Sequence, residues 1–368
     1  MPCAIVRHVR RRVVTAVVVL CIGWALAVRT AVAQERITIA ADVLLYGDNT
    51  EFRNPFREGE TLFGAAPRVS AIFDLGDRAS LQLGIFANQR FGSDKASELT
   101  RPIIALRLRS GNSAFLFGTL ETPRLADPLG PDRTGPHGLL PPIQVETLAF
   151  ERPYEAGFQW LVRSERVRHD AWLSWQQLNT PDHRERFDAG VNTSIRATRA
   201  VTIPLQFHVV HHGGQQFSAG PVADSLAGGG GPSVRWTSGQ FAGDLELIGL
   251  LSRFTPDRER PEFSRTGQAF FARATVERFA WRGHVLFWRG WDFIKEEGDA
   301  NYQSIRSDGT YYRNVRDYAE LGLTRLFQPA ATVRLEVSAR LHRVEKDYGY
   351  SYRVVAIPSM RWVVKGKP

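Results

Sequence analysis

The stretch Ala331–His342 reads ATVRLEVSARLH, and its residues alternate strictly between apolar and polar types. Successive side chains of a β-strand point to opposite faces, so this stretch predicts a strand with one apolar face and one charged face. In a soluble sandwich, the apolar face would cover a core. In a transmembrane barrel, the apolar face would meet lipid and the charged face would line a wet lumen. The start of the chain and the number of similar strands distinguish these arrangements.

The chain begins with the pattern of a secretory signal peptide. Arg10–Arg12 form a basic segment, residues 13–28 form an apolar run, and Ala31–Ala33 has the small-x-small form that signal peptidase cleaves. We expect cleavage after this motif, which leaves a signal peptide, residues 1–33, and one mature domain, residues 34–368. An uncleaved membrane anchor is the alternative, but the apolar run is short for a spanning helix.

Removal of the signal peptide would change both the cysteine content and the net charge of the protein. Both cysteines of the chain, Cys3 and Cys21, lie within it, so the mature domain offers neither disulfides nor thiolate chemistry. The signal peptide also holds five of the 47 Lys and Arg residues and no acidic residue, so the formal net charge falls from +9 to +4. This modest charge, and the lack of zinc-finger, helix-turn-helix or RNP-type motifs, argue against a nucleic-acid partner.

The rest of the chain predicts strands and almost no helix, because apolar residues recur at every second position. We expect about sixteen strands. They are 37–46, 62–75, 81–91, 103–109, 114–121, 155–162, 168–177, 187–196, 201–212, 232–236, 241–254, 267–277, 279–291, 317–327, 331–342 and 350–363.

The connections between these strands alternate in length. Short turns carry Asp77, Asn112 and Arg166, whereas most of the intervening connections are longer, and residues 122–154 form the longest of them. Outer-membrane barrels have this alternation, and an even strand count places both termini on the short-turn side. We also expect loops at three further places, which are the polar segments Gly47–Glu60 and Phe293–Val315 and the Gly-rich segment Gly213–Gly231, where Gly228–Gly231 form a flexible run.

Together these features resemble Gram-negative outer-membrane porin-like β-barrel proteins, over nearly all of the mature chain and at the level of architecture. The resemblance implies an all-β transmembrane antiparallel barrel of about sixteen strands in the cell outer membrane. Its partners would be outer-membrane lipids and the barrel assembly machinery. Sixteen-stranded porins fold a long third loop into the lumen, and residues 122–154 are the third long connection here. Such barrels usually end on an aromatic residue, whereas this chain ends WVVKGKP at residues 362–368.

The function implied by the resemblance is a porin-like channel for passive passage or export of small polar or anionic solutes. Such a channel is not an enzyme and needs no cofactor. Two alternatives remain, an outer-membrane barrel enzyme that acts on lipids and a structural or export barrel without an open pore. Trimers are common in this class, but no feature of the sequence demands a particular oligomeric state.

The candidate pore lining consists of the charged residues at those alternate strand positions whose side chains would point into the lumen. Fixed charges of both signs in a narrow wet pore would sort polar solutes. The alternative is that these residues form cross-strand ion pairs that brace the wall. The set is Arg107, Arg109, Asp244, Glu246, Arg273, Glu277, Arg282, Glu320, Arg334, Glu336 and Arg340.

Charged residues of the long third connection are the candidate constriction. They would set the pore field if this loop folds inward, whereas they would cover the outer mouth if it does not. The set is Arg124, Asp127, Asp132, Arg133, Glu146, Glu151 and Arg152.

Metal-binding patterns are weak in this sequence. His208 and His212 share one face of a predicted strand while His211 points away, so at most two imidazoles converge and we expect no metal site. The segment Asp48–Glu51 offers oxygen ligands but lacks the spacing of a known calcium loop.

Catalytic patterns are weak as well. A lipid hydrolase would need a serine and a histidine together near a barrel rim. His169, His284 and His342 are available, but no serine is spaced to mark a partner.

Overall fold

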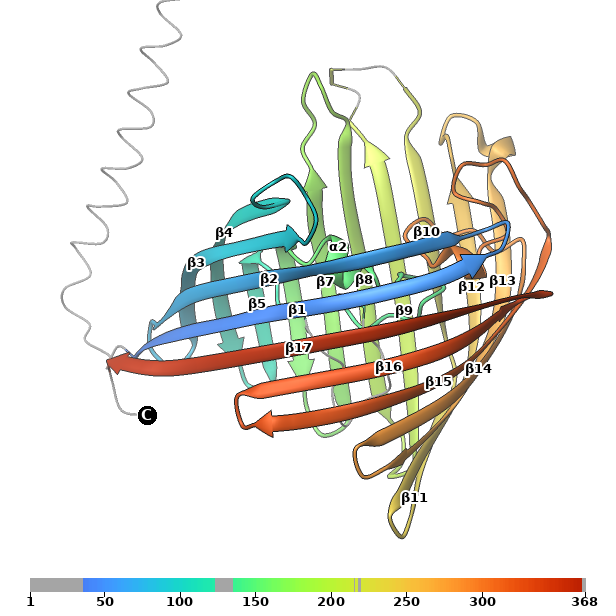
Figure 1. Ribbon diagram of the computed structural model, residues 1–368. Helices are drawn as coiled ribbons and strands as arrows, with labels where there is room; N and C mark the ends of the chain where they lie inside the picture. Colours follow the sequence, from blue (N-terminus) through green and yellow to red (C-terminus); the bar gives the residue numbers. More distant parts are fainter. Residues whose placement is uncertain (1–35, 123–134, 215, 218–219, 366–368) are drawn as a thin grey trace, which may run out of the picture.

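The computed structural model describes residues 36–122, 135–214, 216–217 and 220–365, so the predicted signal peptide lies outside the described residues. The apolar alternation produces one antiparallel sheet (Figure 1). Its strands are β1 (Ile37–Arg53), β2 (Glu58–Asp74), β3 (Ala79–Arg90), β4 (Leu99–Ser110), β5 (Ser113–Thr119), β6 (Ala156–Arg163), β7 (Val167–Gln177), β8 (Glu185–Arg196), β9 (Val201–Gly213), β10 (Ala223–Gly230), β11 (Ser233–Ser238), β12 (Phe241–Thr255), β13 (Arg265–Arg278), β14 (Trp281–Trp291), β15 (Val315–Ala330), β16 (Val333–Val344) and β17 (Asp347–Lys365).

The sheet closes on itself because β1 pairs with both β2 and β17. β10 and β11 lie end to end, and each pairs with β9 on one side and β12 on the other. They therefore fill a single position in the wall, and the seventeen strands form a sixteen-position antiparallel barrel. Closure pairs the first strand with the last, so neither is left as a free edge strand in lipid. The predicted fold class and strand count are confirmed.

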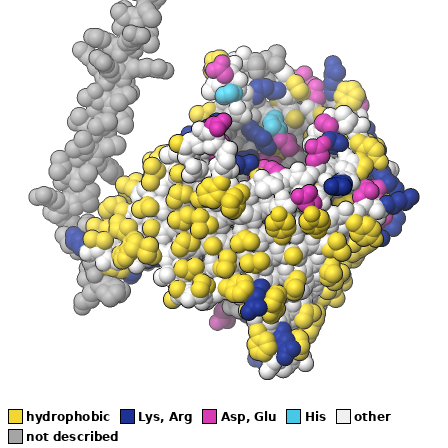
Figure 2. Space-filling model, viewed as in Figure 1, with side chains coloured by type: hydrophobic (Ala, Val, Ile, Leu, Met, Phe, Trp, Pro, Cys, Tyr) yellow, Lys and Arg dark blue, Asp and Glu magenta, His cyan; other side chains and the backbone are white. Residues whose placement is uncertain are grey.

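The two faces of the wall follow the sequence alternation. In β16, Glu336, Ser338 and His342 are buried inside, whereas Val337 and Leu341 are exposed outside. Figure 2 shows the result, a surface on which apolar side chains cover most of the visible outer wall. An apolar exterior with a polar interior is the arrangement of an outer-membrane barrel.

The ends of the barrel differ as predicted. Residues 75–78, 111–112, 164–166 and 331–332 are short turns at the end where β1 begins and β17 ends. The opposite end carries the longer connections, although the β16–β17 turn there, residues 345–346, is short. In outer-membrane barrels the long-loop end faces the cell exterior and the short turns face the periplasm.

The long third connection, for which the sequence leaves two positions open, enters the lumen in the part that the structure describes, residues 135–155. It contains the short helix α2 (Leu148–Glu151) and buries Leu140 and Ile143 completely. Wall side chains hold it: Gln206 Oε1 accepts from the Leu140 amide at 2.8 Å, and Asn88 Nδ2 donates to the Phe150 carbonyl at 3.0 Å. We call residues 135–155 the inward segment.

A second connection, residues 292–314, also reaches inside, and it contains the short 3-10 helix η2 (Ala300–Tyr302). It was predicted to be a polar loop, but Phe293 and Tyr302 are completely buried. Tyr302 packs against Trp288 of β14, with ring centroids 5.4 Å apart. The amide of Val145 donates to the Glu297 carbonyl at 2.6 Å, so the two inward connections support each other. Aromatic burial and shared backbone hydrogen bonds keep this segment inside despite its polar composition.

Two of the loop predictions were wrong. Gly47–Glu60 lies mostly in strands β1 and β2. Its polar residues do not mark a loop, because they point into the lumen: Asp48 and Thr50 are both buried on β1. Much of Gly213–Gly231 is strand β10. A Cβ on Gly229 would lie 2.0 Å from the Gly249 carbonyl oxygen, so glycine permits the close strand approach here. A second 3-10 turn, η1 (Pro261–Phe263), lies in the loop after β12. Among the described residues, no helix is long and apolar enough to cross a bilayer.

Candidate active site

Ser351 and His342 lie side by side on the inner faces of β17 and β16. The two strands form a hairpin in which Ser351 pairs with Arg340, so His342 is its diagonal neighbour on the same face. Diagonal neighbours in a sheet are close enough for long side chains to touch. Oγ of Ser351 lies 2.8 Å from Nε2 of His342. A serine hydroxyl in hydrogen-bond contact with an imidazole is the arrangement of an activated nucleophile.

Glu320 lies on the other side of the imidazole. It is on β15, and the register pairs it directly with His342 on β16. Its Oε2 is 3.2 Å from Nδ1 of His342. Three successive strands therefore present carboxylate, imidazole and hydroxyl in order, which matches the roles of an acid–histidine–serine triad. We call Glu320, His342 and Ser351 the triad.

Tyr318 connects the carboxylate to the imidazole. Its hydroxyl is 2.5 Å from Glu320 Oε2 and 2.7 Å from His342 Nδ1. A hydroxyl has one proton, which the carboxylate attracts, so Nδ1 of His342 donates to the tyrosine oxygen. This tautomer leaves the lone pair of Nε2 for the Ser351 proton. Nε2 of His284 is 2.7 Å from the other carboxylate oxygen of Glu320, which holds that side chain in place.

The triad faces a small internal cavity. Its volume is about 30 Å³, room for roughly one water molecule. Phe52 of β1 packs edge-on against His342, with ring centroids 4.8 Å apart. The lining also includes Asp48, Thr50, Glu146, Thr147, Tyr318, Arg340 and Arg353. The site is therefore shielded from bulk water, and charged groups of both signs lie beside the hydroxyl.

Two exposed tyrosines flank Ser351 on the outer face of the barrel wall. Ser351 is five residues beyond Lys346 in the β16–β17 turn, roughly 17 Å along the strand. Its neighbours Tyr350 and Tyr352 are 55% and 53% exposed on the outer face of β17. Exposed tyrosines of a barrel wall settle at the membrane–water boundary. Ester bonds that join acyl chains to lipid headgroups lie at this same boundary.

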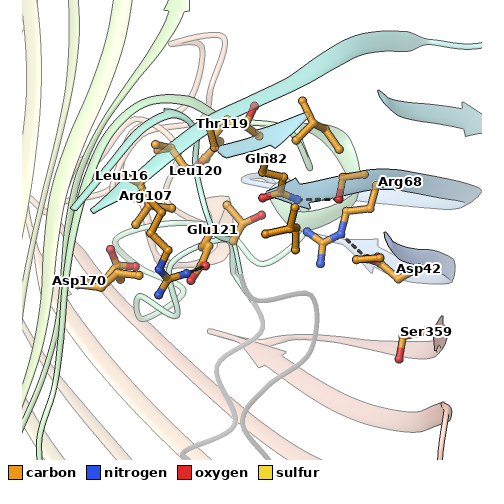
Figure 3. A pocket seen from close by; sticks show the side chains of 18 of the residues that line it. Asp42, Arg68, Gln82, Arg107, Leu116, Thr119, Leu120, Glu121, Asp170 and Ser359 are labelled. Carbon is orange, nitrogen blue, oxygen red and sulfur yellow. Dashed lines mark hydrogen bonds and ion pairs between the residues drawn. The ribbon is translucent and has the colours of Figure 1, made fainter. Parts of the chain in front are cut away.

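A larger cavity, about 1180 Å³, occupies the short-turn end of the lumen (Figure 3). Its lining carries more guanidinium groups than carboxylates. The arginines are Arg68, Arg107, Arg109, Arg163, Arg168, Arg334 and Arg361, and the acids are Asp42, Glu121, Glu155 and Asp170. Two pairs drawn in Figure 3, Arg68–Asp42 and Arg107–Glu121, brace its wall. The excess of positive charge suits anionic solutes.

His137 of the inward segment is one of the residues that line this larger cavity. Its Nδ1 is 2.9 Å from Asp170 Oδ2, and its Nε2 is 2.6 Å from Glu155 Oε2. The ring stacks on Trp172 at a centroid distance of 3.7 Å. Burial lowers the pKa of His137, but the carboxylates of Glu155 and Asp170 outweigh it and raise that pKa to about 10. The imidazolium therefore fastens the inward segment to the wall.

This ion pair predicts a pH dependence of stability. The folded pKa of His137 lies above its ordinary value of 6.5, so the stabilisation is complete below pH 6.5 and is lost as the pH rises through about 10. We expect the thermal unfolding temperature in detergent to fall over this window. His137→Gln should be less stable at pH 6 and should show a flatter profile. A profile unchanged by the substitution would contradict this role.

The structure places the predicted pore-lining residues in three groups. Arg107, Arg109 and Arg334 line the larger cavity, whereas Glu320 and Arg340 border the triad cavity. The remainder lie along the wall: Asp244, Glu246, Arg273, Glu277, Arg282 and Glu336. Arg273 Nη2 is 2.6 Å from Glu246 Oε2, and Arg282 Nε is 2.7 Å from Glu277 Oε1. These directly opposed residues brace neighbouring strands.

The predicted constriction residues are described in part. Arg124, Asp127, Asp132 and Arg133 lie outside the described residues. The other three are inside the lumen but separate: Glu146 contacts Arg340 and Arg353, Glu151 lies 3.7 Å from Arg90, and Arg152 lies 2.7 Å from Glu297. The structure therefore does not gather them into one ring.

The three histidines of β9 meet three different acids. His208 contacts Asp188 at 3.1 Å, His211 contacts Asp224 at 2.7 Å and His212 contacts Glu296 at 2.7 Å. Possible ligand atoms of Asp188, His208 and Glu297 lie within 4.8 Å of one another. Arg152 and Arg186 already bind one oxygen of Glu297, at 2.7 and 2.6 Å, so cationic side chains supply the charge that an ion would bring.

Sequence reasoning missed Ser351 as the partner of His342. The two residues are nine positions apart and show no motif, because a turn and a strand register bring them together. The pairing could have been recognised from the sequence. If the two strands on either side of the tight turn at residues 345–346 are paired as a hairpin, the serine lies diagonally from the histidine on the polar face of the sheet.

Comparison with solved structures supports the barrel assignment. The chain resembles a loop-deletion mutant of OmpT, an outer membrane protein of Vibrio cholerae, with a TM-score of 0.54 and 9% identity over 89% of this chain and 100% of that one. It also resembles OccK5 (OpdH) of Pseudomonas aeruginosa, with a TM-score of 0.50 and 8% identity over 89% and 98%. Identities this low speak only for the fold. They support an outer-membrane β-barrel, and the architectural resemblance to porin-like barrels is confirmed.

A comparison of sequences carries the family assignment. No curated protein matches the chain. A family model described as lipid A 3'-O-deacylase-type matches residues 29–359, which is most of the chain. The expectation that the protein is not an enzyme is therefore wrong. That expectation was inferred from the fold alone, and the same fold can serve both channels and enzymes. The chain belongs to the lipid A 3'-O-deacylase-type family.

Proposed function

We propose that this outer-membrane barrel is an ester hydrolase that removes acyl chains from lipid-A-type glycolipids of the outer leaflet. The observation that carries the proposal is the triad, with Ser351 Oγ 2.8 Å from His342 Nε2 and Glu320 Oε2 3.2 Å from His342 Nδ1. Family membership supports the substrate class, and the exposed tyrosines that flank Ser351 support an acyl ester as the scissile bond.

The chemistry would proceed in two steps. Ser351 Oγ attacks the ester carbonyl carbon while His342 Nε2 takes its proton, and Glu320 and Tyr318 stabilise the charged imidazole through Nδ1. The tetrahedral intermediate collapses, the sugar oxygen leaves with the proton from His342, and an acyl-serine remains. A water molecule, deprotonated by His342, then attacks the acyl-serine. The fatty acid leaves and the serine regains its proton.

The passive-channel alternative has less support. The inward segment and residues 292–304 lie within the lumen between the triad end and the short-turn end. The larger cavity with its excess of arginine could admit anionic solutes from the periplasmic side, but the inward segment contributes His137 to its lining, and the ring of His137 stacks on Trp172. We therefore rank hydrolysis first.

Covalent labelling tests the proposal without knowledge of the natural lipid. Purified protein in detergent is treated with a fluorophosphonate probe, which modifies activated serines, and the labelled peptide is identified by mass spectrometry. We expect labelling at Ser351, none in His342→Gln, and release of free fatty acid from acylated glucosamine esters. Labelling that spreads over many serines, or that persists in His342→Gln, would contradict an activated Ser351.

A further inference from the structure

Two arginines beside Ser351 share one carboxylate oxygen. Nη1 of Arg340 and Nη1 of Arg353 each lie 2.9 Å from Oε2 of Glu146. All three side chains are largely buried, with exposed fractions of 12%, 9% and 10%. Two guanidinium groups that converge on a single oxygen form the arrangement with which proteins hold carboxylates and phosphates.

The two arginines have different supports in the wall. Nε and Nη2 of Arg353 bind Oδ2 of Asp48 at 3.0 and 2.5 Å. Nη1 of Arg340 is 3.7 Å from Oε1 of Glu320, the acidic residue of the triad. Asp48 and Glu320 lie on strands of the barrel wall and not on the inward segment. Their contacts with the two arginines therefore do not depend on Glu146, and we expect them to hold both guanidinium groups in place when Glu146 moves away.

Glu146 differs from those two acids because it comes from the inward segment and not from the barrel wall. It lies two residues before helix α2 and lines the same small cavity as Ser351. Arg340 pairs in register with Ser351, and Arg353 lies two residues further along the same inner face. An anion bound in place of Glu146 would therefore lie next to the nucleophile.

We infer that Arg340 and Arg353 form a binding site for a phosphate-type anionic group of the substrate, and that Glu146 occupies this site when substrate is absent. The inference rests on the proposed hydrolysis for its substrate, whereas anion binding itself does not depend on it. Glu146 acts as an internal competitor: the substrate anion displaces it, takes over both guanidinium contacts and brings the ester toward Ser351. Displacement of Glu146 also enlarges a cavity that holds roughly one water molecule.

Titration calorimetry with inorganic pyrophosphate tests the site independently of catalysis. The mature protein is used in detergent as wild type, Glu146→Gln and Glu151→Gln. Glu151 is the matched control because it belongs to the same segment and contacts Arg90 and Thr147 instead. We expect Glu146→Gln to bind pyrophosphate roughly tenfold more tightly than wild type, with Glu151→Gln unchanged, because only the first variant removes the competing charge. Arg340→Gln in the Glu146→Gln background should abolish the gain. Equal affinity in all three proteins would overturn the inference.

Kinetics then assign the anion to the substrate. Acyl-glucosamine esters with and without a phosphate group are compared, and folding of each variant is verified by its heat-dependent migration in gels. Glu146→Gln should lower KM for the phosphorylated ester roughly tenfold more than it lowers KM for the neutral one. Equal effects on both esters would overturn the phosphate assignment. If no protein cleaves either ester while pyrophosphate binding behaves as expected, the proposed function fails and the anion site stands.

Discussion

Replacing Ser351 by alanine should lower the rate of ester hydrolysis by at least about 10³-fold, because a triad without its nucleophile retains only binding and electrostatic assistance. The fold should survive, since the substitution removes one hydroxyl whose hydrogen-bond partner, Nε2 of His342, faces a cavity large enough for a water molecule. The measurement is fatty-acid release at saturating substrate, with the heat-dependent gel migration of the barrel as the test of folding.

The matched control is Ser70→Ala. Ser70 is also a buried, inward-facing serine, but it lies on β2 and its hydroxyl accepts from Gln82 at 2.8 Å, beside the larger cavity. Its removal should leave hydrolysis unchanged. Glu320→Gln should keep the geometry but weaken the imidazolium, so we expect a loss in kcat smaller than that of Ser351→Ala. Full activity in Ser351→Ala would remove the triad from the mechanism.

The second large effect concerns assembly in the membrane. Leu323 lies in the middle of β15, is 51% exposed on the outer wall, and pairs in register with Gly283 and Ala339. Leu323→Arg places a charge against the hydrocarbon and should destabilise the folded barrel by about 2–4 kcal/mol. The free energy of unfolding in lipid vesicles measures this directly.

Ser359→Arg is the control for Leu323→Arg. Ser359 lies on β17 among the residues that line the larger cavity (Figure 3), where an added charge remains in contact with water. The same side chain should therefore cost less than about 1 kcal/mol at this position, as for other surface substitutions. A larger cost at Ser359 than at Leu323 would mean that the two faces of the wall were assigned the wrong way round.

Much of the barrel follows from local sequence, because period-two alternation is a property of each strand by itself. Residues 331–342 carry that signal, and β16 with its inward Glu336 and outward Val337 matches it. The prediction failed where polarity was taken to mean a loop. In β1, Asp48 and Thr50 are polar because they face the lumen, and in β10 a glycine run forms a strand because the neighbouring strands approach closely.

The site was less predictable than the wall. Glu320, Arg340 and Glu146 were singled out as charged residues of the interior, but nothing local indicated that they surround a serine. Fold analogy also pointed toward a passive channel, and the family comparison overturned the expectation of no enzymatic activity. Of the predicted pore-lining charges, only Glu320 and Arg340 border the proposed catalytic group.

The sequence by itself therefore determined an antiparallel barrel of about sixteen strands and the polarity of its two faces, because alternation and turn spacing act over a few neighbouring residues. Only the tertiary structure decided that residues 135–155 of the third connection enter the lumen and that Ser351, His342 and Glu320 meet. These contacts depend on strand register and on closure of the sheet. A shift of one residue in register would turn Ser351 toward lipid and separate it from the imidazole on which its proposed chemistry depends.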